Sequence, residues 1–138
     1  MAAPTFSKEE KAAMRAAVAE KKAAKEGADA AAACDAAIAA MTGTDKTLAQ
    51  AFHKLVKDNT SLAPKTWYGM PAYTDAEGKV VVAFKPGSKF NIRYASIEFQ
   101  QAAKLDDGNV WPVSWALGKL DDADKKRIAD ILKTAAAS

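Results

Sequence analysis

The residues best suited to chemistry lie in one aromatic stretch and in the apolar runs that follow it. Residues 65–73 read KTWYGMPAY, with three aromatic side chains close together. Aromatic faces stack on planar groups, and a guanidinium binds carboxylate or phosphate through two parallel hydrogen bonds. Aromatic and basic residues together predict a site for a small anion, a planar metabolite or a partner peptide. The predicted site combines three aromatics of this stretch, two later basic residues and a later tryptophan: Trp67, Tyr68, Tyr73, Lys85, Arg93 and Trp115.

The Gly-Met-Pro sequence inside this stretch predicts a sharp bend in a strand. Gly69 permits a positive φ angle, Met70 is held extended by the proline after it, and Pro71 fixes its own φ angle. The bend either packs aromatic residues in a core or forms the rigid wall of a pocket. The basic residues also have two interpretations. They either bind an anion or are the charged side chains that are common on the solvated face of an antiparallel sheet.

Five aspartates are candidate ligands for a hard metal ion, which prefers clustered carboxylate oxygens. They are Asp106, Asp107, Asp121, Asp122 and Asp124. The first two also have the composition of a turn, and the other three suit the start of a helix. Without a histidine or cysteine nearby in the sequence, they would not form a tight metal site and would bind only weakly, through carboxylates alone.

The single histidine, His53, and the single cysteine, Cys34, have no sequence neighbour that would form a nucleophile–base pair. Residues distant in sequence can still meet in the fold. The sequence contains no phosphate-binding loop, zinc-ligand spacing or nucleophile elbow. It therefore favours a binding protein without a resident cofactor over an enzyme.

The charge balance argues against nucleic acid as a partner. The chain of 138 residues carries 20 basic and 17 acidic side chains, a net charge of +3. One cysteine suits a reducing compartment. Residues 1–15 carry charges where a signal peptide has its apolar run, and no long apolar segment follows. We therefore expect a cytoplasmic protein with no membrane partner.

The N-terminal part of the chain is expected to be helical. Residues 1–42 are rich in alanine, the best helix former, and predict a helical N-terminal extension. Ser7 and Glu10 have the spacing of a capping box, and Gly27 is the expected stop of the first helix. The two thin helices expected here cover 7–26 and 29–41.

A stronger amphipathic pattern opens the predicted core at residues 45–138. Apolar residues recur at helical spacing over 45–59, with Asp45 as the expected N-cap. From Leu62 onward the pattern alternates, which predicts strands joined by hairpin turns. The expected strands are the AYT segment before the turn at 75–78 and the runs over 79–86, 89–99 and 110–117.

A last helix, capped by Asp121 or Asp122, completes the pattern. Helices, then hairpins, then a helix describe an α+β domain. We expect a single domain, residues 1–138, with an antiparallel sheet of about four to five strands and helices packed on one face. On that sheet, Lys85, Asn91 and Arg93 would share the face away from the helices.

Four segments together resemble the YdhG-like family of small bacterial proteins, a domain family of unknown function. They read PKTWYGMPAY, GKVVVAF, KFNIRYASIEF and LDDGNVWPVSWAL, and the similarity covers about residues 45–135. The resemblance implies an α+β fold. Some relatives are described as frataxin-like iron chaperones, so it also implies iron as a cargo for the carboxylates. The wider family often has a histidine near the tip of the second hairpin, where this chain reads Lys89-Phe90-Asn91.

The function expected from these observations is a non-catalytic binding module with an aromatic–basic site on its sheet. Two alternatives stay open. One is a frataxin-like iron chaperone that uses surface carboxylates. The other is a homo-oligomeric interaction protein, joined through a sheet edge or the helix at 7–26, so the chain is expected as a monomer or a homodimer.

Overall fold

The computed structural model describes residues 7–137, so residues 1–6 and 138 of the expected domain lie outside the described part. Within it, two helices precede five strands and a third helix follows them, with a short 3₁₀ helix, η1, before the fourth strand. None of these helices combines the length and the apolarity needed to cross a membrane. The bounds are α1 Lys8–Ala39, α2 Gly43–Asn59, β1 Ala63–Trp67, β2 Met70–Thr74, β3 Val80–Lys85, η1 Ser88–Phe90, β4 Ala95–Phe99, β5 Ser114–Leu117 and α3 Asp122–Ala135.

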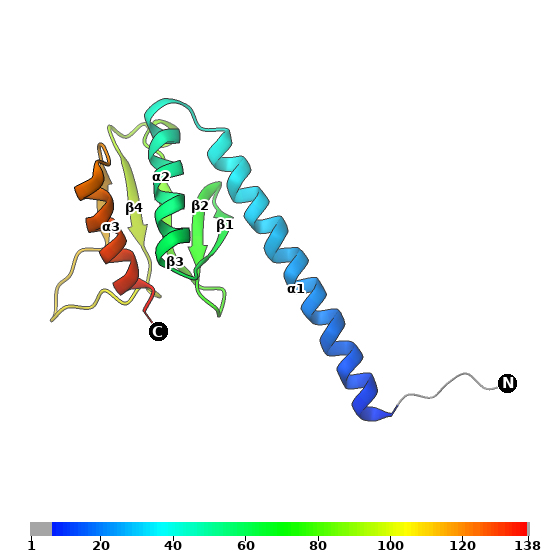
Figure 1. The fold of residues 1–138 in the computed structure, drawn as a ribbon. Helices are drawn as coiled ribbons and strands as arrows, with labels where there is room; N and C mark the ends of the chain where they lie inside the picture. Colours follow the sequence, from blue (N-terminus) through cyan, green and yellow to red (C-terminus); the bar gives the residue numbers. More distant parts are fainter. Residues whose placement is uncertain (1–6, 138) are drawn as a thin grey trace.

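The strands form one antiparallel sheet in the order β1-β2-β3-β4-β5. Figure 1 shows α2 and α3 lying across one face of this sheet, with the last turns of α1 beside them. An antiparallel sheet can leave its other face to solvent, so helices on one face are sufficient to close a core. The expected α+β class is confirmed, as is the antiparallel sheet with helices on one face.

Strand pairing shows which side chains share a face of the sheet. Tyr73, Val82 and Phe99 lie opposite one another in register, and all three belong to the core under the helices. Side chains alternate along a strand, so the neighbouring pair Ala72 and Ala83 lies on the other face. We call this other face, which none of the described helices covers, the open face.

A bulge in β3 alters the expected alternation. The register between β2 and β3 shifts at Tyr73 and Thr74, so β3 has one residue more than its partner there. A bulge places two residues of one strand opposite one residue of the next. Val81 and Val82 are consequently both buried in the core.

The core is centred on Phe52 of α2, whose side chain is fully buried. The Phe52 ring lies 5.7 Å from the ring of Tyr73 and 6.2 Å from that of Phe84, measured between centroids. Ile38 of α1 and Leu132 of α3 belong to the same cluster. All three helices therefore contribute to one core.

One continuous helix replaces the two thin helices expected at the N-terminus. It begins as expected, because the Ser7 side chain accepts a hydrogen bond from the backbone N–H of Glu10 at 3.0 Å. Gly27, however, does not end the helix. A glycine inside a helix costs only about 1 kcal/mol relative to alanine, and helix propagation through the alanines on both sides offsets that cost. Residues 7–29 are exposed and Ile38 is buried, so only the second half of α1 is anchored.

The start of α2 also differs from the expected one. The helix begins at Gly43 with Thr42 as its N-cap, whereas Asp45 was the expected cap. The Asp45 carboxylate lies in the first turn of the helix and binds a distant loop instead. The end of α2 at Asn59 agrees with the sequence pattern.

The last two strands are shorter than expected. β4 begins at Ala95, because residues 88–90 form η1 and Asn91 adopts a left-handed conformation with a φ angle of 54°. β5 begins at Ser114, so Pro112 lies before the strand. Proline has no N–H to donate to a sheet, which explains why pairing starts after it.

Candidate functional site

The tip of the β1–β2 hairpin forms the first part of the site. Tyr68 and Gly69 are the two residues between the strands, and their φ angles are 51° and 76°. Trp67 pairs directly with Met70 across the turn. Two consecutive left-handed residues are typical of the two-residue turn whose twist matches that of antiparallel strands. The expected bend within a single strand is therefore wrong, and the chain reverses at this point.

Tyr68 is an unusual residue for such a turn. Asn, Asp or Gly normally occupy it, because a bulky side chain is crowded in the left-handed region. The Tyr68 side chain is 80% exposed, and its ring lies 5.0 Å from that of Trp67 between centroids. An exposed aromatic residue in a strained backbone position adds little to the core, and such positions cluster at binding sites.

The loop at 86–94, which joins β3 to β4, forms the second part. Asp45 of α2 anchors this loop: its two carboxylate oxygens accept hydrogen bonds from the backbone N–H groups of Gly87 and Ser88, at 3.1 and 3.0 Å. The loop also closes on itself, since a Cβ atom on Gly87 would lie 2.7 Å from the backbone oxygen of Tyr94. The position of the loop is thus set by a helix and by its own backbone.

Replacing Asp45 with alanine should lower the free energy of unfolding by about 2 kcal/mol, because two backbone donors lose a charged acceptor. Thermal unfolding at neutral pH measures the change. The matched control is Asp58→Ala, which removes an exposed carboxylate paired with Lys54 at 2.7 Å. That change should stay below about 0.5 kcal/mol. Equal effects from the two variants would contradict the anchoring role.

The contribution of Asp45 should also depend on pH. Partial burial raises the pKa of Asp45, but hydrogen bonds from the Ser88 side chain and from the backbone of Ser88 and Gly87 outweigh it, so the pKa lies below its ordinary value. Such a group stabilises the fold above its unfolded pKa of about 3.9 and loses this effect as the pH falls through the folded pKa. The stabilities of the wild type and Asp45→Ala should therefore converge as the pH falls below about 4.

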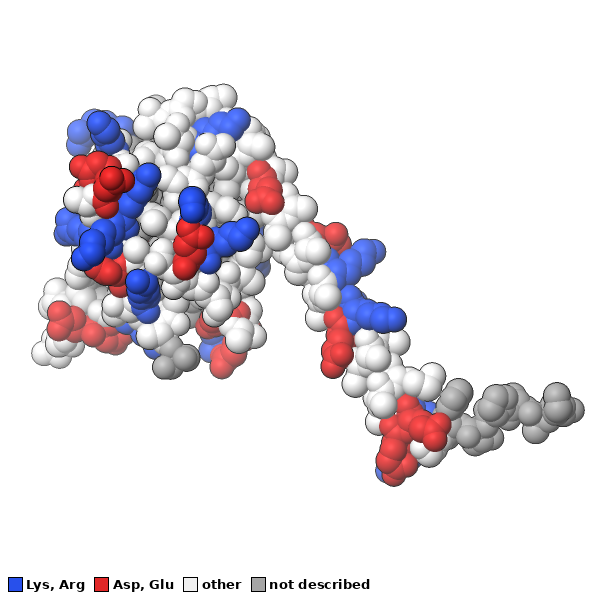
Figure 2. Space-filling model, viewed as in Figure 1, with Lys and Arg blue, Asp and Glu red and all other residues white. Residues whose placement is uncertain are grey.

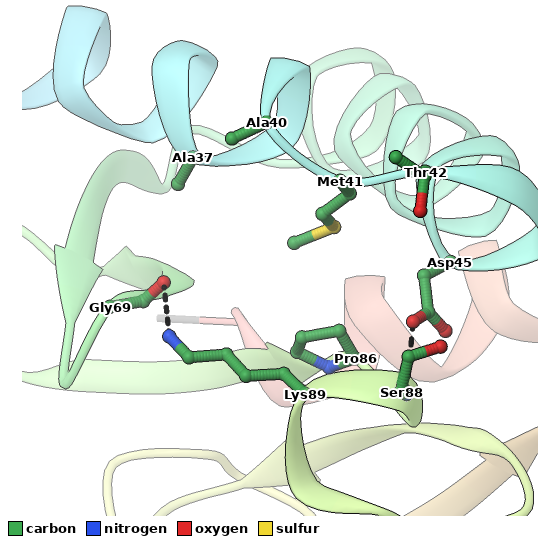
Figure 3. Close-up of a pocket in the computed structure, with 9 residues that line it drawn as sticks. All are labelled: Ala37, Ala40, Met41, Thr42, Asp45, Gly69, Pro86, Ser88 and Lys89. Atoms are coloured by element: carbon green, nitrogen blue, oxygen red, sulfur yellow. Dashed lines mark hydrogen bonds between the residues drawn. The ribbon is translucent and has the colours of Figure 1, made fainter.

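Lys89 connects the loop to the hairpin tip. Its Nζ atom lies 3.5 Å from the backbone oxygen of Gly69. Above this contact is a pocket of about 340 Å³, into which Met41 points from the α1–α2 junction (Figure 3). The residues that line this pocket are Ala37, Ala40, Met41, Thr42, Asp45, Gly69, Pro86, Ser88 and Lys89.

The open face of the sheet adjoins the hairpin tip. Trp67 pairs with Met70, and Met70 lies on the same face as Ala72, two residues further along β2. By the same alternation, Lys85 shares the face of Ala83. Trp67 and Lys85 therefore both lie on the open face. The small side chains of Ala72 and Ala83 lie on the same face.

Basic side chains of the loop region lie against its aromatic rings. Lys85 Nζ is 5.1 Å and Lys89 Nζ 5.8 Å from the centre of the Phe90 ring, and the Arg93 guanidinium is 5.4 Å from that of Tyr94. Phe90 is 39% exposed and Tyr94 is 42% exposed, so both rings also face solvent. We call seven residues of the β1–β2 hairpin, the end of β3 and the loop the aromatic–basic surface: Trp67, Tyr68, Lys85, Lys89, Phe90, Arg93 and Tyr94.

Arg93 reaches this surface from a loop and not from a strand. The expectation that Lys85, Asn91 and Arg93 line one face of two paired strands is wrong, because β4 begins only at Ala95. The left-handed conformation of Asn91 turns the chain before the strand starts.

Tyr73 does not reach the aromatic–basic surface, contrary to expectation. It pairs with Val82 on the helix-covered face, and its side chain is 1% exposed. The hydroxyl oxygen lies 2.9 Å from Nδ1 of His53, and the ring packs edge-on against Phe52. Burial raises the pKa of Tyr73 far above its ordinary value. Tyr73 belongs to β2 and lies on the helix-covered face, whereas Tyr68 lies in the turn that precedes this strand.

Tyr73 is part of a polar group that the sequence pattern did not reveal and that runs from the buried Tyr73 and Cys34 to the exposed Asp35. His53 Nε2 lies 3.6 Å from Asp35 Oδ1, and the Cys34 thiol adjoins the Tyr73 hydroxyl. Burial raises the pKa of Cys34 by more than its hydrogen bond with Tyr73 lowers it, so the thiol stays protonated at neutral pH. The four residues come from α1, α2 and β2, so no spacing along the chain could have shown that they meet.

Trp115 also lies away from the aromatic–basic surface. It pairs with Ile97, a core residue, and therefore belongs to the helix-covered face. The guanidinium of Arg127 of α3 lies 5.1 Å from the centre of its ring. Trp115 thus joins β5 to α3 and does not extend the wall formed by Trp67 and Tyr68.

The five candidate aspartates cap α3, lie in its first turn or lie exposed in a loop, and they do not form a metal site together. The carboxylates of Asp121 and Asp124 each accept a hydrogen bond from the other's backbone N–H, at 2.8 and 3.1 Å, and so cap α3. The bond from the Asp124 backbone is the main cause of the lowered pKa of Asp121. Asp122 lies in the first turn of α3, and Asp106 and Asp107 are exposed in the 100–113 loop. Within residues 7–137, no three His, Cys, Asp or Glu side chains lie close enough to hold a metal ion together.

No protein-family model matches the chain, and no curated protein or solved structure matches it.

Proposed function

We propose that this protein is a non-catalytic binding module that holds small planar anions on its aromatic–basic surface. Flat rings stack on planar groups, and lysine and arginine bind phosphate or carboxylate. The hairpin tip and the loop at 86–94 supply both kinds of side chain, and Lys89 joins the two elements. A nucleoside monophosphate or an aromatic carboxylate meets both requirements.

The observation that carries this proposal is the position of Tyr68. A left-handed backbone costs a residue with a side chain about 1 kcal/mol or more relative to glycine. A ring that is 80% exposed recovers little of that cost through burial. A residue that strains the backbone without filling the core is typical of a binding position.

The charges around the surface support an anionic ligand. The sequence has no Asp or Glu from residue 62 to 74 or from 79 to 97. Within the described part of the chain, Lys85, Lys89 and Arg93 form no ion pair with a carboxylate. Their positive charges are thus available to a ligand, and the aromatic rings beneath them restrict where they point.

We also propose that the chain is a relative of the YdhG-like family, on the four segments that resemble it. Its α+β fold supports this relationship. Iron handling, described for some relatives, is not supported by the candidate aspartates, which form no metal-binding group within residues 7–137. We keep the cytoplasm as the proposed location, because a lone cysteine suits a reducing compartment.

Titration with adenosine monophosphate, adenosine and inorganic phosphate tests the proposed function. The monophosphate should bind most tightly, because it alone combines a planar group with a negative charge. Amide NMR shifts should concentrate at residues 67–69 and 86–94. If inorganic phosphate binds as tightly as the monophosphate, or if shifts are confined to the helices, the proposal is wrong.

Replacing Tyr68 with asparagine should change stability and binding in opposite directions. Asparagine favours the left-handed turn, so the free energy of unfolding should rise by about 0.5–1 kcal/mol. Loss of the stacking ring should weaken adenosine monophosphate binding at least about tenfold. Tyr68→Phe is the matched control, because it retains both the ring and the strain. Calorimetric titration and thermal unfolding measure the two effects, and unchanged binding in Tyr68→Asn would remove Tyr68 from the site.

A further inference from the structure

The first half of α1 extends away from the rest of the molecule (Figure 1). Residues 8–29, which we call the projecting segment, are all exposed. At 1.5 Å per residue, the segment is about 33 Å long. Neither the core nor the aromatic–basic surface uses it.

Basic side chains gather along one side of the projecting segment. Successive residues of a helix are about 100° apart, and five cations fall within a sector of about 120°. Glu9 and Glu20 lie on the opposite side, and Lys8, Glu10 and Glu26 lie just outside the sector, with Glu26 3.9 Å from Lys22. Asp29 falls within the sector, at the end of the segment nearest the sheet. In Figure 2, basic side chains stand out from one edge of this helix. The basic sector consists of Lys11, Arg15, Lys21, Lys22 and Lys25.

Two apolar side chains lie in the middle of the basic sector. Met14 and Val18 are one helical turn apart, and they are 50% and 67% exposed. Counted at about 100° per residue, Val18 lies about 160° around the helix from Ile38, which packs into the core. Met14 and Val18 therefore do not lie on the side of α1 that packs into the core, and the core cannot cover them.

A flat anionic surface fits this arrangement best. It contacts one sector of the helix and leaves Glu20 and the alanine-rich side in water. Cations near anionic lipid headgroups each add to the affinity, and an amphipathic helix places its apolar residues between the headgroups. A second copy of the chain does not fit face to face, because the two basic sectors would repel each other. Nucleic acid matches the charge, but its hydrated phosphates offer no apolar contact for Met14 and Val18.

We propose that the projecting segment lies on anionic lipid surfaces through its basic sector, as a peripheral contact that leaves the domain outside the bilayer. This proposal differs from the expectation, drawn from the sequence, that the protein has no membrane partner. The attraction is electrostatic in the first place, so it should weaken as the salt concentration rises. The domain and its aromatic–basic surface remain in water in this arrangement.

Sedimentation of the full-length chain with lipid vesicles tests this proposal. Vesicles of phosphatidylcholine mixed with phosphatidylserine should bind the protein, and vesicles of phosphatidylcholine alone should not. The double variant Lys21→Gln/Lys25→Gln should bind the mixed vesicles at least about tenfold more weakly. The matched control is Ala16→Glu/Ala23→Glu, which changes the net charge equally on the opposite side of the helix. It should weaken binding by less than about threefold, because its charges are partly screened from the surface.

Three outcomes would overturn the proposal. Absence of binding to the mixed vesicles is the first. Equal weakening by the two double variants, with helix content unchanged by circular dichroism, would show that only net charge matters. Tighter binding to an oligonucleotide than to the mixed vesicles at the same salt concentration, lost in Lys21→Gln/Lys25→Gln, would assign the basic sector to nucleic acid instead.

Discussion

Replacing Phe52 with alanine should lower the free energy of unfolding by about 4 kcal/mol. The Phe52 side chain is fully buried between α2 and the sheet, where its ring contacts those of Tyr73 and Phe84. Its removal loses the transfer free energy of the ring and leaves a cavity that the rigid sheet can close only in part. Denaturant titration followed by circular dichroism measures the loss.

Phe90→Ala is the matched control, because it is the same substitution at a position that is 39% exposed. Its effect on the free energy of unfolding should stay within about 1 kcal/mol. A loss below about 1.5 kcal/mol for Phe52→Ala would show that the core is not centred on this ring.

Gly87→Ala should be the second most damaging change, with a loss of about 3 kcal/mol in the free energy of unfolding. The φ angle of Gly87 is −67°, so its backbone conformation suits any residue. The obstacle is space, because an added Cβ would lie 2.7 Å from the backbone oxygen of Tyr94 and 2.9 Å from that of Ile92. These atoms can move only if the loop moves. The variant should therefore also weaken adenosine monophosphate binding, as measured by calorimetry.

Gly69→Ala provides the contrast. Its φ angle of 76° penalises a side chain by about 1–2 kcal/mol. The added Cβ, however, would meet only the end of the flexible Lys89 side chain, which can turn away. Thermal unfolding should rank Gly87→Ala as the more destabilising of the two, and the reverse order would falsify the steric argument.

The sequence predicted those features of the fold that are determined by residues close together in the chain. Ser7 caps α1 and Asp121 caps α3, as their positions indicated. The change from helical to alternating spacing near Leu62 predicted the strands, since each period reflects which side of an element is buried. The α+β class followed from these two signals.

Contacts between distant residues account for most of what the sequence could not show. Asp45 binds the backbone of Gly87, 42 residues away, and that contact positions the loop carrying Arg93. Tyr73 bonds to His53 across the core, which removes it from the predicted site. No local pattern encodes such contacts, because a side chain's spacing does not reveal its partner.

Other expectations were wrong because the backbone adopts conformations that the local sequence does not favour. The turn at Tyr68 was unexpected, because a bulky residue in the left-handed region is rare and no signal distinguishes it from an extended one. The bulge at Val81 shifted one side chain to the opposite face for a comparable reason. Both depend on how the strands pair, which is settled only when the sheet is complete.

The order of the strands has a consequence for how fast the sheet can assemble. Every strand pairs with the next one along the chain, and the first reversal needs only the two residues between Trp67 and Met70. Pairing between sequence neighbours closes short loops, which keeps the entropic barrier to folding low. The sheet can grow hairpin by hairpin from β1, on a timescale on the order of milliseconds. Closure of the 100–113 loop, the longest between two strands, should be the slowest of these steps.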